Sequence, residues 1–299
     1  IMNPEIIEIS IGLIQINSSY VCIKRNEEPY KDHIEFPGGK KKSNETSSIC
    51  LIRELKEELD IDIKKFKLIT SIKHNYIKKL ITINVYKIHK YSGTIKPNEG
   101  RDIIYFNHYD SHKVLPTHFD VLNLHKIPKL LKIISKEALN KISYESLNLF
   151  SHIRLRDISY SFYKKYIEDK LLEFNFNGNL IVDYPHNIDW EDKYYGIHYK
   201  SSFIRNVNQQ KKDSVLYSAS CHNLKDIELC NERPFNFILL SPVLESHHDY
   251  SPLGWQAFSD LSKLSYKPIL ALGGTSSRNN DLITCINNSG FGLSGIRYF

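Results

Sequence analysis

The sequence has few cysteines and no long apolar run, and each absence excludes a class of protein. Its five cysteines are scattered, odd in number and never spaced Cys-x-x-Cys, which argues against a disulfide framework and a structural zinc site. No stretch approaches the ~20 apolar residues needed to cross a membrane. The first residues lack the basic region of a secretory signal. We therefore expect a cytoplasmic protein with reduced thiols and no membrane partner.

The length and charge of the chain are those of a two-domain globular protein. It has 299 residues, of which 41% are hydrophobic, enough for two cores. The net charge of +6 is spread over short lysine pairs such as Lys64–Lys65. Lysine pairs of this kind are typical of solvated loops and helix faces, although a basic surface can also steer phosphate-bearing substrates. Without a recognised docking motif, we expect no specific nucleic-acid partner.

The first part of the chain alternates predicted strands with one helix. The alternation of apolar residues predicts strands over residues 6–16, 20–24, 66–74 and 80–90, and a Pro-Gly-Gly loop over residues 36–39. A helix is predicted over Glu45–Leu59, with Thr46 and Ser47 favouring its start. Its predicted apolar stripe consists of Ile49, Ile52, Leu55 and Leu59.

The pattern of apolar residues changes near residue 128, where short apolar runs recur between predicted helical stretches. Eight such strands with intervening helices fit a (β/α)₈ barrel. The segment is much shorter than the ~250 residues typical of that fold, so its helices must be short or one of them missing. We predict domains over residues 1–127 and 128–299. The expected strands are 130–134, 152–155, 180–182, 195–199, 215–218, 237–240, 269–272 and 292–296.

Three glutamates stand together on the predicted helix. Glu54, Glu57 and Glu58 are spaced i, i+3 and i+4, which places their side chains on one helical face. Like charges this close repel one another, so the triplet favours a bound cation. Hard divalent ions such as Mg²⁺ bind carboxylate oxygens together with substrate phosphate oxygens. The spacing therefore predicts a metal site for phosphoryl chemistry.

The neighbours of the triplet support this interpretation. Gly38 and Gly39 let the loop backbone approach the helix and a phosphate closely. Arg53 is placed to pair with Glu57 at i,i+4 and to orient that carboxylate.

Residues 39–61 resemble the Nudix box, Gly-x5-Glu-x7-Arg-Glu-U-x-Glu-Glu-x-Gly-U, in which U is apolar. Asp60 replaces the last glycine of the box, which ends the helix in a left-handed conformation that Asp tolerates better than most residues. The resemblance implies a Nudix hydrolase with an α/β/α sandwich around a mixed sheet. The matching positions are Gly39, Glu45, Arg53, Glu54, Leu55, Glu57, Glu58 and Ile61.

Residues 34–40 look like the loop of MutT-type Nudix hydrolases, which cleave oxidised guanine nucleotides such as 8-oxo-dGTP to monophosphate and pyrophosphate. That resemblance implies Mg²⁺, with Mn²⁺ as a substitute, a nucleoside triphosphate substrate, and a role in nucleotide-pool sanitation, DNA repair and DNA replication. The metal ligands it implies are Glu54, Glu57 and Glu58. The other implied site residues are Arg53 and Glu99 for catalysis, and Arg25, Phe36, Gly38, Gly39 and Lys40 for substrate binding.

One departure concerns recognition of the base. MutT-type enzymes carry a Phe-Pro-x-Ala-Asn segment whose Asn reads the oxidised purine, and the matching stretch here places Phe119 at the Asn position. A slip of one residue offers Asp120 instead. Losing the amide removes a hydrogen-bonding group for the purine edge. The substrate thus stays open between 8-oxo-dGTP and another pyrophosphate, such as a thiamine-related one.

The second part of the chain carries six short motifs, at residues 154–156, 195–198, 218–222, 241–243, 268–274 and 290–296. With these motifs it resembles thiamine phosphate synthase and its TenI-like relatives, and fusions that join a MutT-type domain to such a barrel. The matching pieces lie on or after predicted strands, where barrel active sites are found. A double glycine after the seventh strand presents backbone N–H groups to a phosphate. The implied site for a phosphorylated ligand is Arg154, Arg156, Asp183, His198, Ser220, His222, Gly273 and Gly274.

The metal-binding carboxylates of the synthase are incomplete in this chain. Asp183 matches one of them, but Val182 replaces the adjacent Asn, and no acid stands at the second position after His198. Diphosphate displacement without its carboxylates is disfavoured. We therefore expect a barrel that is degenerate as a synthase and binds a ligand or stabilises the protein, with a bifunctional protein of thiamine biosynthesis as the alternative.

Overall fold

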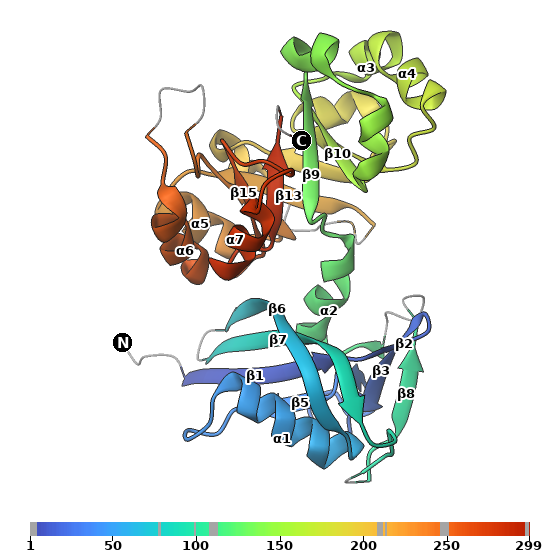
Figure 1. Ribbon diagram of the computed structural model, residues 1–299, viewed down its shortest axis with the longest axis vertical. Coiled ribbons are helices and arrows are strands. Elements are labelled where there is room, and N and C mark those ends of the chain that lie inside the picture. The colour runs from blue at the N-terminus through green and yellow to red at the C-terminus, as the bar shows by residue number, and fades with distance from the viewer. Residues whose placement is uncertain are drawn as a thin grey trace. The chain divides into compact units, whose positions relative to one another are not determined.

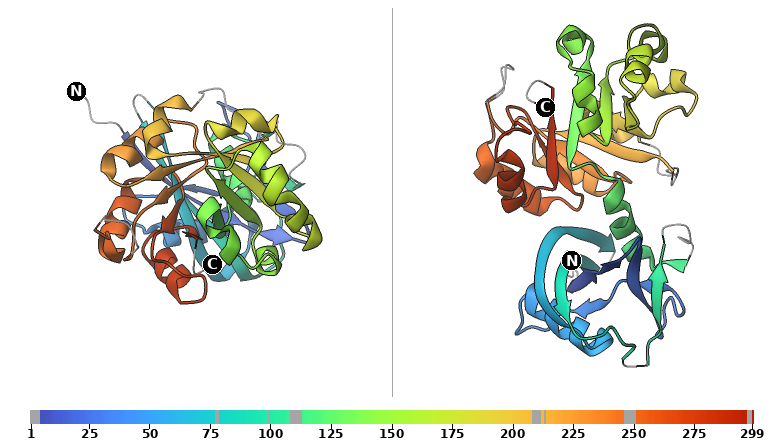
Figure 2. Two further views of the ribbon diagram at one scale, coloured as in Figure 1. Left: turned by 90° about the horizontal axis from the view of Figure 1, so that it is seen from above. Right: turned by 45° about the vertical axis from the view of Figure 1, so that its right-hand side comes forward.

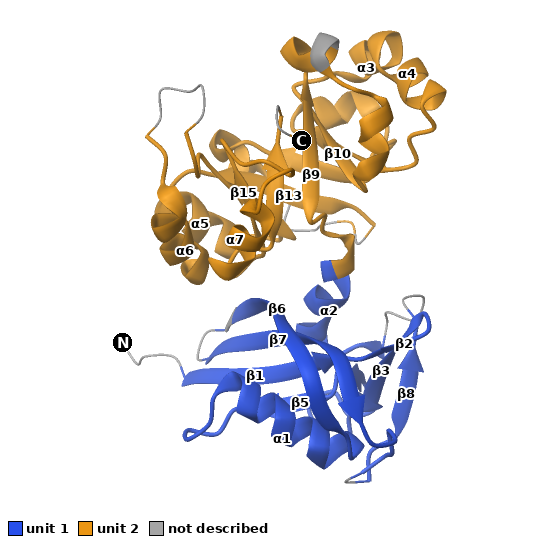
Figure 3. Ribbon diagram, viewed as in Figure 1, with its two compact units in different colours: residues 1–124 blue, residues 125–299 orange. Residues whose placement is uncertain are grey.

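In the computed structural model the chain divides into two compact units, residues 1–124 and residues 125–299 (Figure 3). The structure describes residues 5–76, 79–98, 100–107, 113–207, 212, 214–245, 251–296 and 299. Within these ranges, no helix has the length and apolar character that a membrane span requires. The boundary predicted from the sequence, between residues 127 and 128, lies three residues beyond the division between the units.

The first unit contains a mixed four-stranded sheet in the order β5-β1-β7-β6 (Figure 1). Strand β1 (Glu5–Leu13) runs antiparallel to β5 (Gly38–Lys40) and parallel to β7 (Lys79–Ser92). Strand β6 (Asp62–Tyr76) is antiparallel to β7. The predicted loop over residues 36–39 is therefore wrong in part, because Gly38 and Gly39 pair with β1 as an edge strand.

A second sheet completes this unit. Strand β3 (Ser19–Lys24) pairs antiparallel with its three neighbours. Strand β8 was not predicted from the sequence, because residues 101–107 directly follow a polar, turn-rich segment and were not recognised as a strand. The neighbours of β3 are β2 (Gln15–Ile16), β4 (Ile34–Glu35) and β8 (Ile103–Phe106).

Helix α1 (Ser47–Leu59) forms as the sequence predicts but buries a different stripe. The Thr46 side chain caps its start by accepting a hydrogen bond from the Ile49 N–H at 3.2 Å. Its end is Asp60, whose φ of 54° is left-handed, as expected from its place in the motif. The predicted stripe is partly wrong, because Ile49 and Ile52 are exposed. The i, i+4 row that enters the core is Leu51, Leu55 and Leu59.

The remaining helix of the first unit, α2 (Pro116–Asn123), has proline in its first turn and contacts β6. A short 3₁₀ helix, Leu124–Lys126, follows it directly.

The second unit is a closed barrel of eight parallel strands, and Figure 2 shows its helices and strands from two further sides. All eight predicted strands are confirmed, and neighbours along the chain pair in register until the last closes onto the first. The strands are β9 (Leu130–Ser135), β10 (His152–Arg156), β11 (Asn179–Asp183), β12 (Gly196–Tyr199), β13 (Leu216–Cys221), β14 (Phe237–Leu240), β15 (Ile269–Leu272) and β16 (Gly292–Gly295).

The connections between the barrel strands are short, which explains how a domain of this length closes a barrel. Those after β9, β11 and β12 contain only 3₁₀ helices in the described residues, namely η3 (Lys136–Lys141), η4 (Glu145–Leu149), η5 (His186–Trp190) and η6 (Ser201–Asn206). The others carry α-helices of at most eleven residues. These are α3 (Tyr160–Tyr166), α4 (Glu168–Glu173), α5 (Leu224–Asn231), α6 (Gly254–Leu264) and α7 (Asp281–Asn287).

Candidate active site

The glycine-rich strand β5 lies directly against the acidic face of helix α1. A side chain at Gly39 would bring its Cβ within 2.4 Å of the Glu54 carboxylate. Gly38 has a φ of +141°, and a Cβ there would meet the Ser10 carbonyl oxygen at 2.1 Å. Only glycine lets the two backbones come this close. Gly38, Gly39 and Glu54, the first glutamate of the triplet, thus form one compact cradle.

Arg53 joins three carboxylates around this cradle. Its Nη1 donates to Glu54 Oε1 at 2.7 Å and to Glu57 Oε2 at 2.9 Å, so the expected i,i+4 pair with Glu57 is confirmed. Its Nε and Nη2 bind the carboxylate of Glu45 at 3.1 and 2.6 Å. Nη2 also donates to the Lys40 carbonyl oxygen at 3.2 Å, which ties β5 to the helix.

Glu58 faces a different set of partners. Its Oε2 accepts a hydrogen bond from the Gly38 N–H at 2.8 Å, and its Oε1 pairs with Arg101 at 2.9 Å. The residue is only 1% exposed. Burial raises the pKa of Glu58 to about 8, although Arg101 and the Gly38 N–H favour its charged form.

The ion pairs continue from Arg101 toward the first strands. Arg101 Nη1 also contacts Glu35 Oε1 at 3.2 Å, and Arg25 Nη1 contacts Glu35 Oε2 at 3.1 Å. A chain of alternating charges therefore runs from Glu58 through Arg101 and Glu35 to Arg25. Sequence reasoning found Arg25 but missed Glu35, although it lies in the matched segment 34–40, and Arg101, whose local pattern resembles that of any loop arginine.

The three predicted metal ligands are on one helix but pair with two different arginines. Glu54 and Glu57 share Arg53, whereas Glu58 pairs with Arg101. Among the described residues, no group of three His, Cys, Asp or Glu side chains is gathered to hold an ion. Glu99, the fourth predicted acid, lies outside the described residues. Arginines thus balance the charge of these carboxylates. Carboxylate oxygens are also the ligands that a hard divalent ion such as Mg²⁺ prefers.

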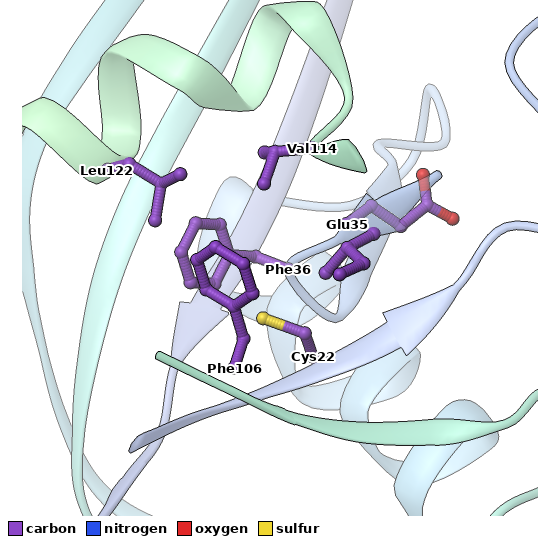
Figure 4. Close-up of a pocket in the computed structure, with 7 residues that line it drawn as sticks. Cys22, Glu35, Phe36, Phe106, Val114 and Leu122 are labelled. Atoms are coloured by element: carbon purple, nitrogen blue, oxygen red, sulfur yellow. The ribbon is translucent and has the colours of Figure 1, made fainter. Parts of the chain in front are cut away.

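A small apolar pocket lies beside this network. Phe36 and Phe106 stand next to each other there, with Val114 and Leu122 facing them (Figure 4). The Glu35 carboxylate turns away from the rings, toward its arginine partners. Cys22 and Ile34 complete the lining. All of these side chains are buried, so the pocket is a packing space within the core.

The residues predicted to read the base lie on α2. Phe119 and Asp120 are both partly buried there, but the pocket is lined by Leu122 of the same helix instead. His118 is buried, and its Nδ1 accepts a hydrogen bond from the Phe36 N–H at 3.0 Å. His118 was not predicted as a site residue, because the family segment has its base-reading residue at the next position, which is Phe119 here.

In the barrel, Asp183 is fully engaged by an arginine. Arg154 Nε donates to Asp183 Oδ1 at 2.7 Å and Nη2 donates to Oδ2 at 2.9 Å, with both side chains buried. The Asp157 N–H adds a third donor at 3.3 Å. This two-pronged pair is a strong one. The carboxylate that matches a metal ligand of the synthase is therefore already paired with a side chain of the protein.

Other predicted barrel residues lie at the carboxyl ends of the strands. The His198 ring is held between Ser218 Oγ at 2.9 Å and Ser220 Oγ at 2.8 Å. His222 Nδ1 lies 2.9 Å from the Ser241 carbonyl oxygen. The remaining ones are Arg156, half-buried at the end of β10, and Gly273 and Gly274, which have φ values of +92° and +69° after β15.

Two buried histidines should make the barrel sensitive to acid. Burial lowers the pKa of His152 to about 4 and holds that of His198 well below its ordinary 6.5. The unfolded chain takes up these protons below pH 6.5 and the folded barrel does not, so stability is present above pH 6.5 and falls toward pH 4. We expect a loss of up to ~1.4 kcal/mol per pH unit for each histidine.

Tryptophan fluorescence measures this loss, because Trp190 and Trp255 are the two tryptophans of the chain and both lie in the barrel unit. Urea unfolding at several pH values should show the decline, and His152→Phe should make it shallower. A free energy of unfolding that stays constant from pH 7 to pH 4.5 would contradict the buried, neutral state of these rings.

Comparisons with known proteins agree with the geometry of the first unit. A family model described as NUDIX domain matches residues 8–123. An 8-oxo-dGTP diphosphatase of Proteus vulgaris is 30% identical over 96 residues, covering 29% of this chain and 86% of that protein. An 8-oxo-dGTP diphosphatase of Buchnera aphidicola is 36% identical over 108 residues, covering 33% of this chain and 82% of that protein.

A solved structure is similar over a larger share of the chain. It is a thiamine phosphate pyrophosphorylase from Pyrococcus furiosus, 14% identical, with a TM-score of 0.43, covering 56% of this chain and 85% of that one.

Proposed function

This chain belongs to the Nudix family of hydrolases, and from that premise we propose that it is a Mg²⁺-dependent nucleoside triphosphate pyrophosphohydrolase of the MutT type. The observation that carries the proposal is the acidic face of α1, with Glu54 and Glu57 around one guanidinium and Gly39 against Glu54. The preferred substrate would be 8-oxo-dGTP, which the matched relatives are named for. Its cellular role would be sanitation of the nucleotide pool in support of DNA replication and repair.

Each site residue would have a role that follows from its chemistry. Glu54, Glu57 and Glu58, with Glu99, would hold Mg²⁺ or Mn²⁺, which neutralises phosphate charge and lowers the pKa of water. Arg53 fixes the orientation of Glu54 and Glu57. Arg25 and Lys40 would bind phosphate, and the backbone of Gly38 and Gly39 would let it approach.

The apolar pocket beside the network is a packing space of the core rather than a site for a base. Phe36 and Phe106 are each 3% exposed, so neither ring presents a free face to a base. Phe119 and Asp120, the residues matched to the base-reading segment, do not line it. The proposal of a nucleotide substrate rests instead on the relatives named 8-oxo-dGTP diphosphatase.

A second candidate is hydrolysis of a thiamine-related pyrophosphate. The replacement of the base-reading Asn by Phe119 and the presence of a barrel in the same chain favour it. The Arg154–Asp183 pair supports a barrel that binds a phosphorylated ligand or stabilises the protein rather than a metal-dependent synthase, since it takes up the matching carboxylate.

A substrate panel distinguishes these functions. The full chain with Mg²⁺ would be given 8-oxo-dGTP, dGTP, dATP, dCTP and thiamine diphosphate, with release of pyrophosphate and phosphate both recorded. We expect the highest kcat/KM for 8-oxo-dGTP, and no turnover after chelation of the metal. Faster hydrolysis of thiamine diphosphate than of 8-oxo-dGTP would replace the first proposal by the second.

A further inference from the structure

Arg101 reaches the acidic face of α1 from a loop that is tied to the end of that helix. The Asn98 N–H donates to the Glu58 carbonyl oxygen at 3.1 Å, and Asn98 Nδ2 donates to the Glu57 carbonyl oxygen at 2.7 Å. The Arg101 N–H in turn donates to the Asn98 carbonyl oxygen at 3.2 Å. The backbone that carries Arg101 is therefore fixed beside Glu58.

The guanidinium of Arg101 lies between two buried carboxylates. Its Nη1 contacts Glu58 Oε1 at 2.9 Å and Glu35 Oε1 at 3.2 Å. Glu58 and Glu35 are 1% and 8% exposed, so water screens these contacts poorly. The other oxygen of Glu58 accepts the Gly38 N–H. Both oxygens of Glu58 therefore already have a partner within the protein.

The balance of charge distinguishes Arg101 from Arg53. Arg53 pairs with three carboxylates, so that cluster, with every group charged, keeps two negative charges that a divalent ion would balance. The chain of ion pairs from Glu58 to Arg25 consists of two carboxylates and two guanidiniums and is already neutral. A divalent ion that bound Glu58 would therefore add positive charge where none is needed.

We propose that Arg101 and the divalent ion compete for Glu58, so that Arg101 lowers the affinity of the chain for the metal. An ion on Glu58 Oε1 would lie a few ångströms from the guanidinium, and like charges this close repel strongly in a poorly screened site. Arg101 would keep a counter-charge after losing Glu58, because Glu35 also contacts it. Arg101 is thus a positioning residue that acts through Glu58. This inference rests on the proposed metal-dependent hydrolysis.

The affinity for Mn²⁺ tests this competition without any substrate. Mn²⁺ is titrated into the full chain, and the electron paramagnetic resonance signal of the free ion gives the dissociation constant. Arg101→Gln removes the charge and should tighten binding by at least about tenfold, since a unit charge this near an ion contributes more than that even when partly screened. Damage to the fold would weaken binding, so a gain in affinity reports the loss of the competitor.

Two variants separate this effect from a general change in charge. Arg101→Lys keeps a cation beside Glu58, and its dissociation constant should stay closer to that of the wild type than to that of Arg101→Gln. Lys56→Gln removes a positive charge of α1 that pairs with Asp60 instead of Glu58, and should leave the affinity at the wild-type value. Equal or weaker binding by Arg101→Gln than by the wild type, or an equal gain in Lys56→Gln, would overturn the inference.

The wild type offers a test that requires no variant to fold. Phenylglyoxal modifies accessible guanidiniums, and peptide mass spectrometry locates each modified arginine. Mn²⁺ should speed the modification of Arg101, because the ion takes Glu58 from it. Arg233 of the barrel unit is 18% exposed, against 21% for Arg101, and should react equally fast with and without Mn²⁺.

The outcomes for the wild type are distinct. An Arg101 rate that Mn²⁺ leaves unchanged or lowers, in a protein that binds Mn²⁺ and hydrolyses its substrate, would overturn the competition alone. A wild type that binds no Mn²⁺ would overturn the inference together with the metal site of the proposed function.

Discussion

Replacing Glu57 by Gln should lower kcat for 8-oxo-dGTP by more than about 100-fold, because a metal site contributes several kcal/mol of charge stabilisation and each 1.36 kcal/mol is tenfold in rate. The fold should survive. Glu57 is 42% exposed, and Gln keeps an acceptor for Arg53 Nη1. Glu54→Gln should act in the same direction. Steady-state turnover with Mg²⁺ measures the loss, and circular dichroism of each variant shows whether the helix is intact.

A matched control is available on the same helix. Lys56 pairs with Asp60 at the helix end, with both side chains 49% exposed, and exposed pairs contribute little to stability. Lys56→Gln should therefore keep kcat within about twofold of wild type. Full turnover by Glu57→Gln would mean that α1 is not the metal-binding helix.

Removing Arg154 should be the most costly single change in the barrel. Arg154→Met leaves the Asp183 carboxylate, whose side chain is 0% exposed, without its charged partner. An uncompensated buried charge of this kind costs about 3–5 kcal/mol. Urea unfolding followed by tryptophan fluorescence reports the loss for the barrel unit, which holds Trp190 and Trp255.

The double variant separates loss of a pair from loss of packing. Arg154→Met combined with Asp183→Leu removes both charges, and should recover much of the stability because apolar replacements of buried pairs are often tolerated. Lys200→Gln, which breaks the half-exposed pair with Asp157, should cost less than ~1 kcal/mol. A cost below ~1 kcal/mol for Arg154→Met would contradict the importance assigned to the buried pair.

Much of the architecture was predictable from local pattern. Each barrel strand is a short apolar run between polar turns, and Phe237–Leu240 and Ile269–Leu272 have the predicted bounds. The end of α1 at Asp60 followed from its place in a motif with fixed spacing. These features depend on residues close together in the chain, so a single sequence carries them.

The parts of the site that escaped prediction depend on contacts between distant segments. Glu35 and Arg101 are 66 residues apart, and their pair forms because β4 and the strand that follows Arg101, β8, both pair with β3. The Phe36–His118 hydrogen bond spans 82 residues. Even in α1, the choice of Leu51 over Ile49 and Ile52 as the buried row depends on how the helix sits on its sheet.

The most direct measurement is product analysis after incubating the wild-type full chain with Mg²⁺ and 8-oxo-dGTP. We expect 8-oxo-dGMP and pyrophosphate in equal amounts, with neither formed after chelation of the metal and with both formed more than about 100-fold more slowly by Glu57→Gln. Failure to release pyrophosphate from 8-oxo-dGTP, and from every other nucleoside triphosphate tried, would contradict pyrophosphohydrolysis by the acidic face of α1.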